Sequence, residues 1–213
     1  MWFVGAVFAL ATTVQAATII SNGAPDHTGT AYGANMSELL VAEDFTLAGT
    51  FDISNIRFWS LQLAAADYRG SAYWAIFDDN AGTPGSILQG NVAATVAAAA
   101  TGFATGFGYA EYVFNIPVSF QLTAGTYWLA LHNGAISDGT AAEMLWSNSA
   151  TGGGLAGVYT DVPLAAPPIW IEVGQEGAFL LEGSAPTSEV PEPGTVILLA
   201  GGLVFGAYLR RKR

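Results

Sequence analysis

Short apolar runs separated by turn residues occupy the chain from residue 17 to about residue 183, and this pattern most constrains the fold. The runs are rich in β-branched and aromatic residues, and Gly, Asn, Asp and Pro separate them. Runs of this kind are typical of strands in antiparallel sandwiches. The clearest predicted strands are residues 39–47, 53–63, 72–77, 109–122, 125–132, 144–147, 170–173 and 178–182. The sequence therefore predicts an all-β domain, an antiparallel β-sandwich of the jelly-roll-like type.

Two of the predicted strands are apolar on both faces, at residues 73–77 and 127–131. Such strands are expected in the centre of a sheet, covered by the other sheet on one side and by loops or a partner on the other. Residues 93–100 are ambiguous, because a helix competes with a strand there and no caps decide between them. The predicted core contains Trp74, Phe77, Phe114, Tyr127 and Leu129.

The first sixteen residues form an apolar run that ends in the small-residue pattern Val14-x-Ala16. This arrangement predicts a secretory signal peptide, residues 1–16, that is cleaved between Ala16 and Ala17. The alternative is a buried core segment. Residues 184–190 are rich in Pro, Ser and Thr and are interpreted as a linker between the domain and the C-terminal tail.

The tail, residues 191–213, contains an uncharged stretch, residues 195–209, followed by Arg210, Arg211, Lys212 and Arg213. Fifteen residues make a helix of about 22 Å, which is shorter than a bilayer core of about 30 Å. Such a helix can still sit in the bilayer if the basic side chains snorkel to its surface. The basic cluster predicts that this end of a transmembrane helix stays in the cytoplasm.

The segment Val190-Pro191-Glu192-Pro193-Gly194, followed by the apolar helix and the basic end, resembles the PEP-CTERM sorting signal of Gram-negative bacteria. The resemblance implies that an exosortase processes the protein near the Pro-Glu-Pro triplet. It also implies a transient stay in the inner membrane, followed by delivery to the cell surface or the exopolysaccharide matrix. An ordinary tail-anchored protein is the alternative. Residues 73–85 and 122–128 are also similar to a module of exported bacterial proteins, which implies a β-sandwich without assigned catalysis.

Charge and composition exclude several function classes. Between residues 17 and 193 the chain has seventeen acidic residues and only Arg57 and Arg69, which is a net charge of −15. A domain this acidic lacks the basic surface that nucleic acids require. There is no cysteine and there are only two histidines, so disulfides, thiolate metal sites and multi-histidine centres are excluded.

Paired carboxylates are the catalytic chemistry that this composition leaves open, in an arrangement like that of glycoside hydrolases. No motif fixes the spacing of any pair, and the alternative is a set of solvated surface acids. The non-catalytic interpretation is therefore preferred. The candidate carboxylates are Asp78, Asp79, Glu111, Asp138, Glu143 and Asp161.

Two binding hypotheses follow from the side chains. Asp78, Asp79 and Asn80 place oxygen ligands on one turn, which suits calcium, although a plain turn needs the same residues. Trp146 and Trp170 flank Gly-, Ser- and Pro-rich loops and are predicted to be exposed, where aromatic rings can stack on sugars. Trp59, Trp74 and Trp128 lie inside apolar strands and are predicted to be core residues.

The sequence thus predicts a non-catalytic protein of the cell surface or exopolysaccharide matrix. A carbohydrate-binding module that uses Trp146 or Trp170 is the second hypothesis, and a carboxylate-dependent glycan hydrolase is the third.

Overall fold

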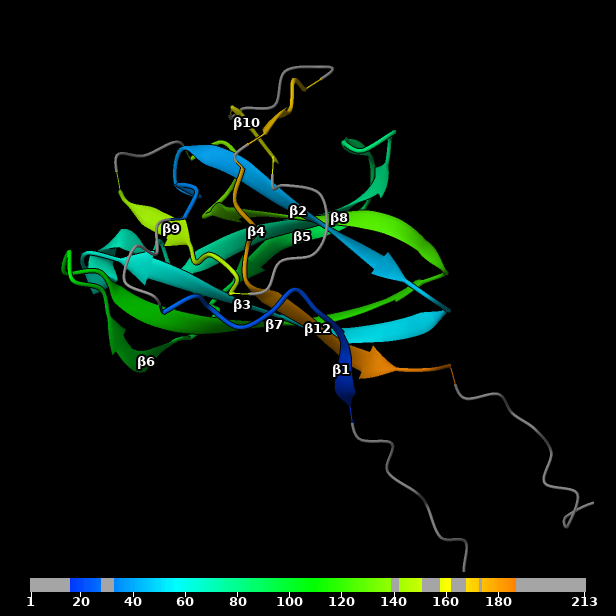
Figure 1. Ribbon diagram of the computed structural model, residues 1–213, viewed down its shortest axis with the longest axis horizontal. Helices are drawn as coiled ribbons and strands as arrows, with labels where there is room; N and C mark the ends of the chain where they lie inside the picture. The colour runs from blue at the N-terminus through cyan, green and yellow to red at the C-terminus, as the bar shows by residue number, and fades with distance from the viewer. Residues whose placement is uncertain are drawn as a thin grey trace, which may run out of the picture.

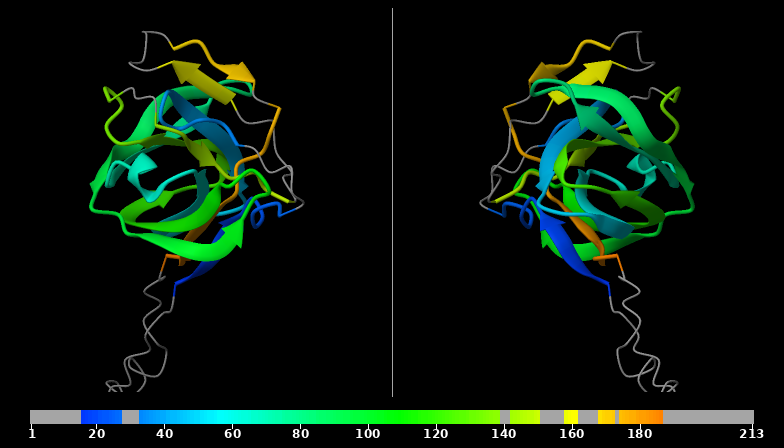
Figure 2. Two further views of the ribbon diagram at one scale, coloured as in Figure 1. Left: turned by 90° about the vertical axis from the view of Figure 1, so that its left-hand side faces the viewer. Right: turned by 90° about the vertical axis from the view of Figure 1, so that its right-hand side faces the viewer.

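The computed structural model describes residues 16–27, 33–138, 142–150, 158–161, 168–172 and 174–186. Two antiparallel sheets face one another across a common core (Figure 1). Seen from the sides, the sheets curve around this core as two layers (Figure 2). The predicted all-β antiparallel sandwich is confirmed.

We name each sheet after its central strand. The β3 sheet has the order β1 (Ala17–Ser21), β12 (Phe179–Ser184), β3 (Phe51–Gln62), β7 (Ala110–Leu122) and β6 (Ala98–Ala104), and β9 (Met144–Trp146) pairs with the end of β3. The β8 sheet has the order β11 (Ile171–Glu172), β10 (Val158–Asp161), β2 (Leu39–Leu47), β8 (Gly125–Asn133), β4 (Ser71–Asp79) and β5 (Pro84–Ala94). A short 3-10 helix, η1 (Ala65–Asp67), precedes β4.

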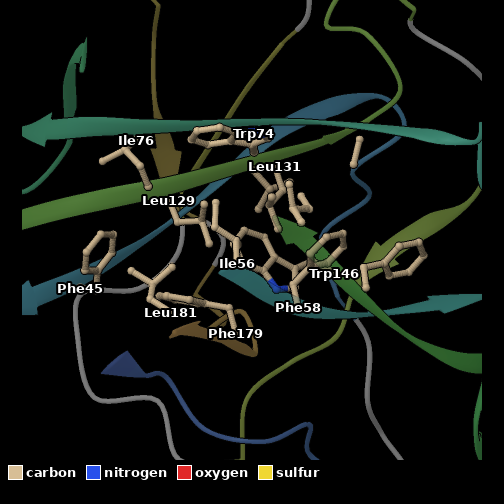
Figure 3. Packing of buried hydrophobic residues seen from close by; sticks show 14 of the residues in the cluster. Phe45, Ile56, Phe58, Trp74, Ile76, Leu129, Leu131, Trp146, Phe179 and Leu181 are labelled. Atoms are coloured by element: carbon tan, nitrogen blue, oxygen red, sulfur yellow. The ribbon is translucent and has the colours of Figure 1, made fainter. Parts of the chain in front are cut away.

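The core lies between the two sheets, and side chains that alternate along the strands supply it. Ile56 and Phe58 of β3 face Leu129 and Leu131 of β8 (Figure 3). Phe58 also stacks on Phe114 of β7 with ring centroids 4.8 Å apart. The five predicted core residues are all buried, four of them between the sheets, whereas Phe77 is buried on the outer face of the β8 sheet.

The β8 sheet is apolar on its outer face as well. Phe77 and Trp128 are buried there, together with smaller residues of β2, β4 and β8. Ile136, in the loop after β8, and Trp170 pack over them. The expectation that loops would cover central strands of this composition is confirmed, and this cover brings Trp170 to the sheet.

The ambiguous segment 93–100 is not helical. It contains the end of β5, a turn at Thr95 with φ of 62°, and the start of β6. Strands β1, β5, β6 and β10 were not among the clear predictions, whereas the bounds of the other strands agree to within about two residues.

The predicted signal peptide lies outside the described residues except for Ala16, and so does the tail, residues 191–213. In the part of the chain that the structure describes, there is no helix with the length and hydropathy needed to cross a bilayer.

Candidate functional site

A pocket of about 510 Å³ opens where the β4–β5 turn approaches the segment 168–170. A volume of this size is typical of small-ligand sites. Its lining combines carboxylate, amide and hydroxyl groups with the flat surfaces of a proline and a tryptophan. The lining residues are Asp78, Asp79, Asn80, Thr83, Pro84, Gly85, Ser86, Pro168 and Trp170.

Hydrogen bonds within the β4–β5 turn hold its side of the pocket. The Asn80 N–H donates to the Thr83 carbonyl at 2.8 Å, and the Thr83 hydroxyl donates back to the Asn80 carbonyl at 3.0 Å. Asp79 Oδ1 accepts the Gly82 N–H at 3.1 Å, and Asp78 Oδ1 accepts the Ser86 N–H. Asx side chains commonly close turns in this way. The acidic groups are therefore fixed in place before any ligand arrives.

Asp79 also connects the turn to the outer apolar face of the β8 sheet. The indole Nε1 of Trp128, which is fully buried, donates to Asp79 Oδ1 at 3.0 Å. This bond satisfies a buried donor, which would otherwise destabilise the fold. One carboxylate therefore supports both the turn and the sheet below it.

Trp170 forms the opposite wall of the pocket. Its ring meets Phe77 edge to face, with centroids 5.6 Å apart and an interplanar angle of 86°. The side chain is half-buried, and its Nε1 atom is buried without a hydrogen-bond partner among the described residues. Because this atom is buried, Trp170 contributes its apolar ring to the pocket wall rather than its N–H group.

The prediction that Trp146 is exposed and binds glycan is wrong. Its side chain is 1% exposed and belongs to the core between the sheets (Figure 3). Its Nε1 donates to the Ala178 carbonyl at 2.9 Å. The Ser- and Gly-containing loop after β9 suggested exposure, but the three residues of β9 pair with β3 and turn the indole inward.

The calcium hypothesis stays a prediction. Asp78, Asp79 and Asn80 do line one pocket, as the sequence suggested, but the hydrogen bonds that they make to main-chain groups hold the turn itself. Among the described residues, no three His, Cys, Asp or Glu side chains are grouped so that they could hold a metal ion. Of the described residues that line the pocket, Asp78 and Asp79 are the acidic ones.

The structure does not bring the other candidate carboxylates to this pocket. Asp138 accepts the Ala135 N–H beside Gly134, which bridges Ala72 at the opposite end of β4 from Asp78. Six residues along a strand separate positions by about 20 Å. Glu143 precedes β9 of the β3 sheet, and the side chain of Asp161 lies outside the description.

Glu111 has a structural role in the β3 sheet. It is 2% exposed, and its carboxylate lies 3.1 Å from Nε2 of His27. The hydroxyl of Thr101 donates to it at 2.8 Å and that of Ser147 at 3.5 Å. These partners occupy both carboxylate oxygens, so Glu111 links the segment before residue 28 to β6, β7 and the end of β9.

Five pocket residues were not predicted as site residues from the sequence: Thr83, Pro84, Gly85, Ser86 and Pro168. Thr83 and Ser86 follow the acidic turn directly, so the β4–β5 turn itself was the signal that could have identified them. Pro168 could not be identified, because only the folded chain brings it to a turn more than eighty residues earlier.

Comparison with protein families gives one match, and it lies in the tail. Residues 189–213 match the model for the PEP-CTERM protein-sorting motif. The chain carries a PEP-CTERM sorting motif. A comparison with curated proteins finds no match to the chain. The motif marks an exported protein that an exosortase sorts and that is held transiently in the membrane.

The matched range contains every predicted sorting residue, so the resemblance seen in the sequence is confirmed. The range begins shortly after β12, which ends at Ser184. The PEP-CTERM motif is therefore separate from the pocket and assigns no ligand to it.

Proposed function

We propose that this PEP-CTERM chain is a non-catalytic protein of the cell surface or exopolysaccharide matrix. The sorting motif at residues 189–213 carries the proposal, because it directs the protein out of the cell. The domain supports it: Asp78, Asp79, Glu111 and Asp138 are used in turns or in buried hydrogen bonds, and they are distributed over both sheets.

Processing of the tail is the first test. Cleavage after the triplet removes Arg210, Arg211, Lys212 and Arg213 together with the apolar stretch, and it releases a domain with a net charge of −15. Mass spectrometry of the extracellular fraction should find a C-terminal peptide that ends close to Pro193. An intact Arg213 terminus found only in inner membranes would contradict this expectation.

We also propose a specific activity for the pocket, which is binding of polysaccharide. Trp170 and Pro168 offer flat apolar surfaces for a sugar ring. Asp78 and Asp79 have carboxylate oxygens that can accept hydrogen bonds from sugar hydroxyls. These two negative charges repel anionic sugars, so a neutral polysaccharide is the expected ligand.

Substitution of the aromatic wall tests this activity. Trp170→Ala should weaken binding of neutral oligosaccharides on a glycan array on the order of tenfold, since it removes the stacking surface. The matched control is Phe107→Ala, because Phe107 is 60% exposed in the turn between β6 and β7. Equal binding by both variants, or binding of uronic acid polymers alone, would contradict the proposal.

A further inference from the structure

One edge of the sandwich carries no charge. From Asn80 to Ala110 the sequence has no acidic, basic or histidine residue, although the rest of the domain is strongly acidic. This stretch forms β5, one edge strand of the β8 sheet, and β6, one edge strand of the β3 sheet. Soluble proteins usually protect edge strands with charged side chains, because an open edge can pair with another strand.

The backbone of β5 is open along this edge. Within the β8 sheet, the Tyr73 N–H points away from β5, since it donates to the Gly134 carbonyl at 3.1 Å. Tyr73 lies opposite Val92, and antiparallel pairs alternate between bonded and non-bonded. The backbone groups of Gly90, Val92 and Ala94 therefore point outward. Among the described residues, the Val92 N–H donates to Oδ1 of its neighbour Asn91 at 2.8 Å and to no other strand.

The side chains around this backbone are also exposed and uncharged. Ile87, Leu88 and Val92 are among the exposed large apolar residues of the described chain. Leu88 lies at a register shift, and Pro84 begins the strand, so both interrupt pairing near the β4–β5 turn. The regular part of the β5 edge begins after the register shift at Leu88. Its outward-pointing backbone N–H and C=O groups belong to residues 90–94.

The other edge strands fit a partner strand less well. β1 has a register shift after Thr18, and Thr18 lies opposite the charged Glu182. β6 is irregular between Ala100 and Ala104, and the ring of His27 stacks on its Phe103 at 3.9 Å. β11 has two residues, and one of them is Glu172.

We propose that β5 is a self-association edge, at which residues 90–94 pair antiparallel with the same residues of a second copy of this chain. A twofold axis at Val92 lets all three outward backbone positions pair, with Gly90 opposite Ala94 of the second copy. Charge favours a second copy as the partner at this edge. Two domains of net charge −15 repel each other least when their uncharged β5 edges meet. The inference goes beyond the proposed function and uses none of the residues that line the pocket.

The absence of cysteine from the chain permits a direct test. In the full-length chain in mild detergent, Val92→Cys should form a disulfide-linked dimer under gentle oxidation. Residues facing one another across an antiparallel pair have Cα atoms about 4.5–5.5 Å apart, within the range that a disulfide spans. Asn91→Cys should form the disulfide instead if the twofold axis lies at Asn91, one residue away. Ser54→Cys is the control, because Ser54 is exposed on a strand that is paired on both sides.

Dimer formation at Val92 or Asn91 that exceeds the Ser54→Cys background several-fold supports the proposal. In the chain without an added cysteine, Val92→Lys should abolish the dimer seen by analytical ultracentrifugation, since with the axis at Val92 it places like charges opposite each other. Ser54→Lys should leave the dimer unchanged. Circular dichroism melting confirms that each variant is folded. Crosslinking of the two β5 variants no greater than that of Ser54→Cys would overturn the proposal, as would a dimer that persists in Val92→Lys.

Discussion

Replacing Trp146 with alanine should lower the free energy of unfolding by about 3–5 kcal/mol, the range for removal of a large buried side chain. The indole packs near Phe179, with ring centroids 6.2 Å apart, and donates to the Ala178 carbonyl. The substitution removes both the ring and this hydrogen bond. Since a domain is stable by about 5–15 kcal/mol, the loss is a large part of the total.

The surroundings of Trp146 place the effect at the upper end of that range. A Cβ atom on Gly177 would lie only 2.6 Å from Cε2 of the indole, so the ring lies directly against the main chain. The Gly177 N–H is held by Glu43 Oε2 at 2.7 Å, and main chain fixed by hydrogen bonds relaxes poorly into a cavity. Unrelaxed cavities give the largest destabilisation. Trp146→Phe keeps much of the volume, so it should be the milder of the two substitutions.

Urea unfolding measured by circular dichroism checks this expectation. Trp170→Ala is the control, because Trp170 is half-buried at the pocket. Its removal should lower the free energy of unfolding only a little, whereas it should weaken glycan binding. The opposite result, in which Trp146→Ala is as stable as the natural chain and loses glycan binding, would restore the prediction made from the sequence.

The strands that could be predicted are those with a buried face. β2, β7 and β8 were located almost to the residue, because burial requires a regular apolar pattern. The edge strands β5 and β6 are exposed along most of their described length, so no such pattern marks them. Their alanines and glycines are poor strand formers, and pairing with β4 and β7 decides their structure.

Half of the candidate site could be predicted. The acidic turn and Trp170 were each singled out, since turn chemistry and an aromatic residue beside a proline-rich loop are visible locally. Their meeting in one pocket was not visible, because it depends on how the chain beyond β10 folds over the β8 sheet. Trp146 failed for the related reason that the local sequence does not show which side of a short strand faces the core.

Glu43 predicts an unusual dependence of stability on pH. Its side chain is 1% exposed in β2, and its Oε2 accepts the Gly177 N–H at 2.7 Å, whereas Oε1 has no partner among the described residues. Burial, opposed by that hydrogen bond and reinforced by Glu176 and Asp44, raises the pKa of Glu43 from 4.5 to about 9. The folded protein therefore holds this carboxyl group in its neutral form at neutral pH.

The sign of the effect follows from where the proton is held. Between pH 4.5 and about 9 the folded state keeps a proton on Glu43 that the unfolded state has lost, so stability falls as the pH rises through this window. The loss from this one group is roughly 3 kcal/mol by pH 7. Glu43→Gln removes the titration and keeps an acceptor for Gly177. Relative to the natural chain, it should gain stability progressively above pH 4.5.

Urea unfolding of both proteins at pH 4, 6 and 8 measures this difference directly. The stability of Glu43→Gln minus that of the natural chain should increase from pH 4 to pH 8, because only the natural chain loses the contribution of the bound proton. Glu38→Gln is the matched control, since Glu38 is exposed on the surface just before β2 and should leave the pH dependence unchanged. A difference for Glu43→Gln that stays constant across this range would show that Glu43 ionises in the folded protein as it does in the unfolded chain.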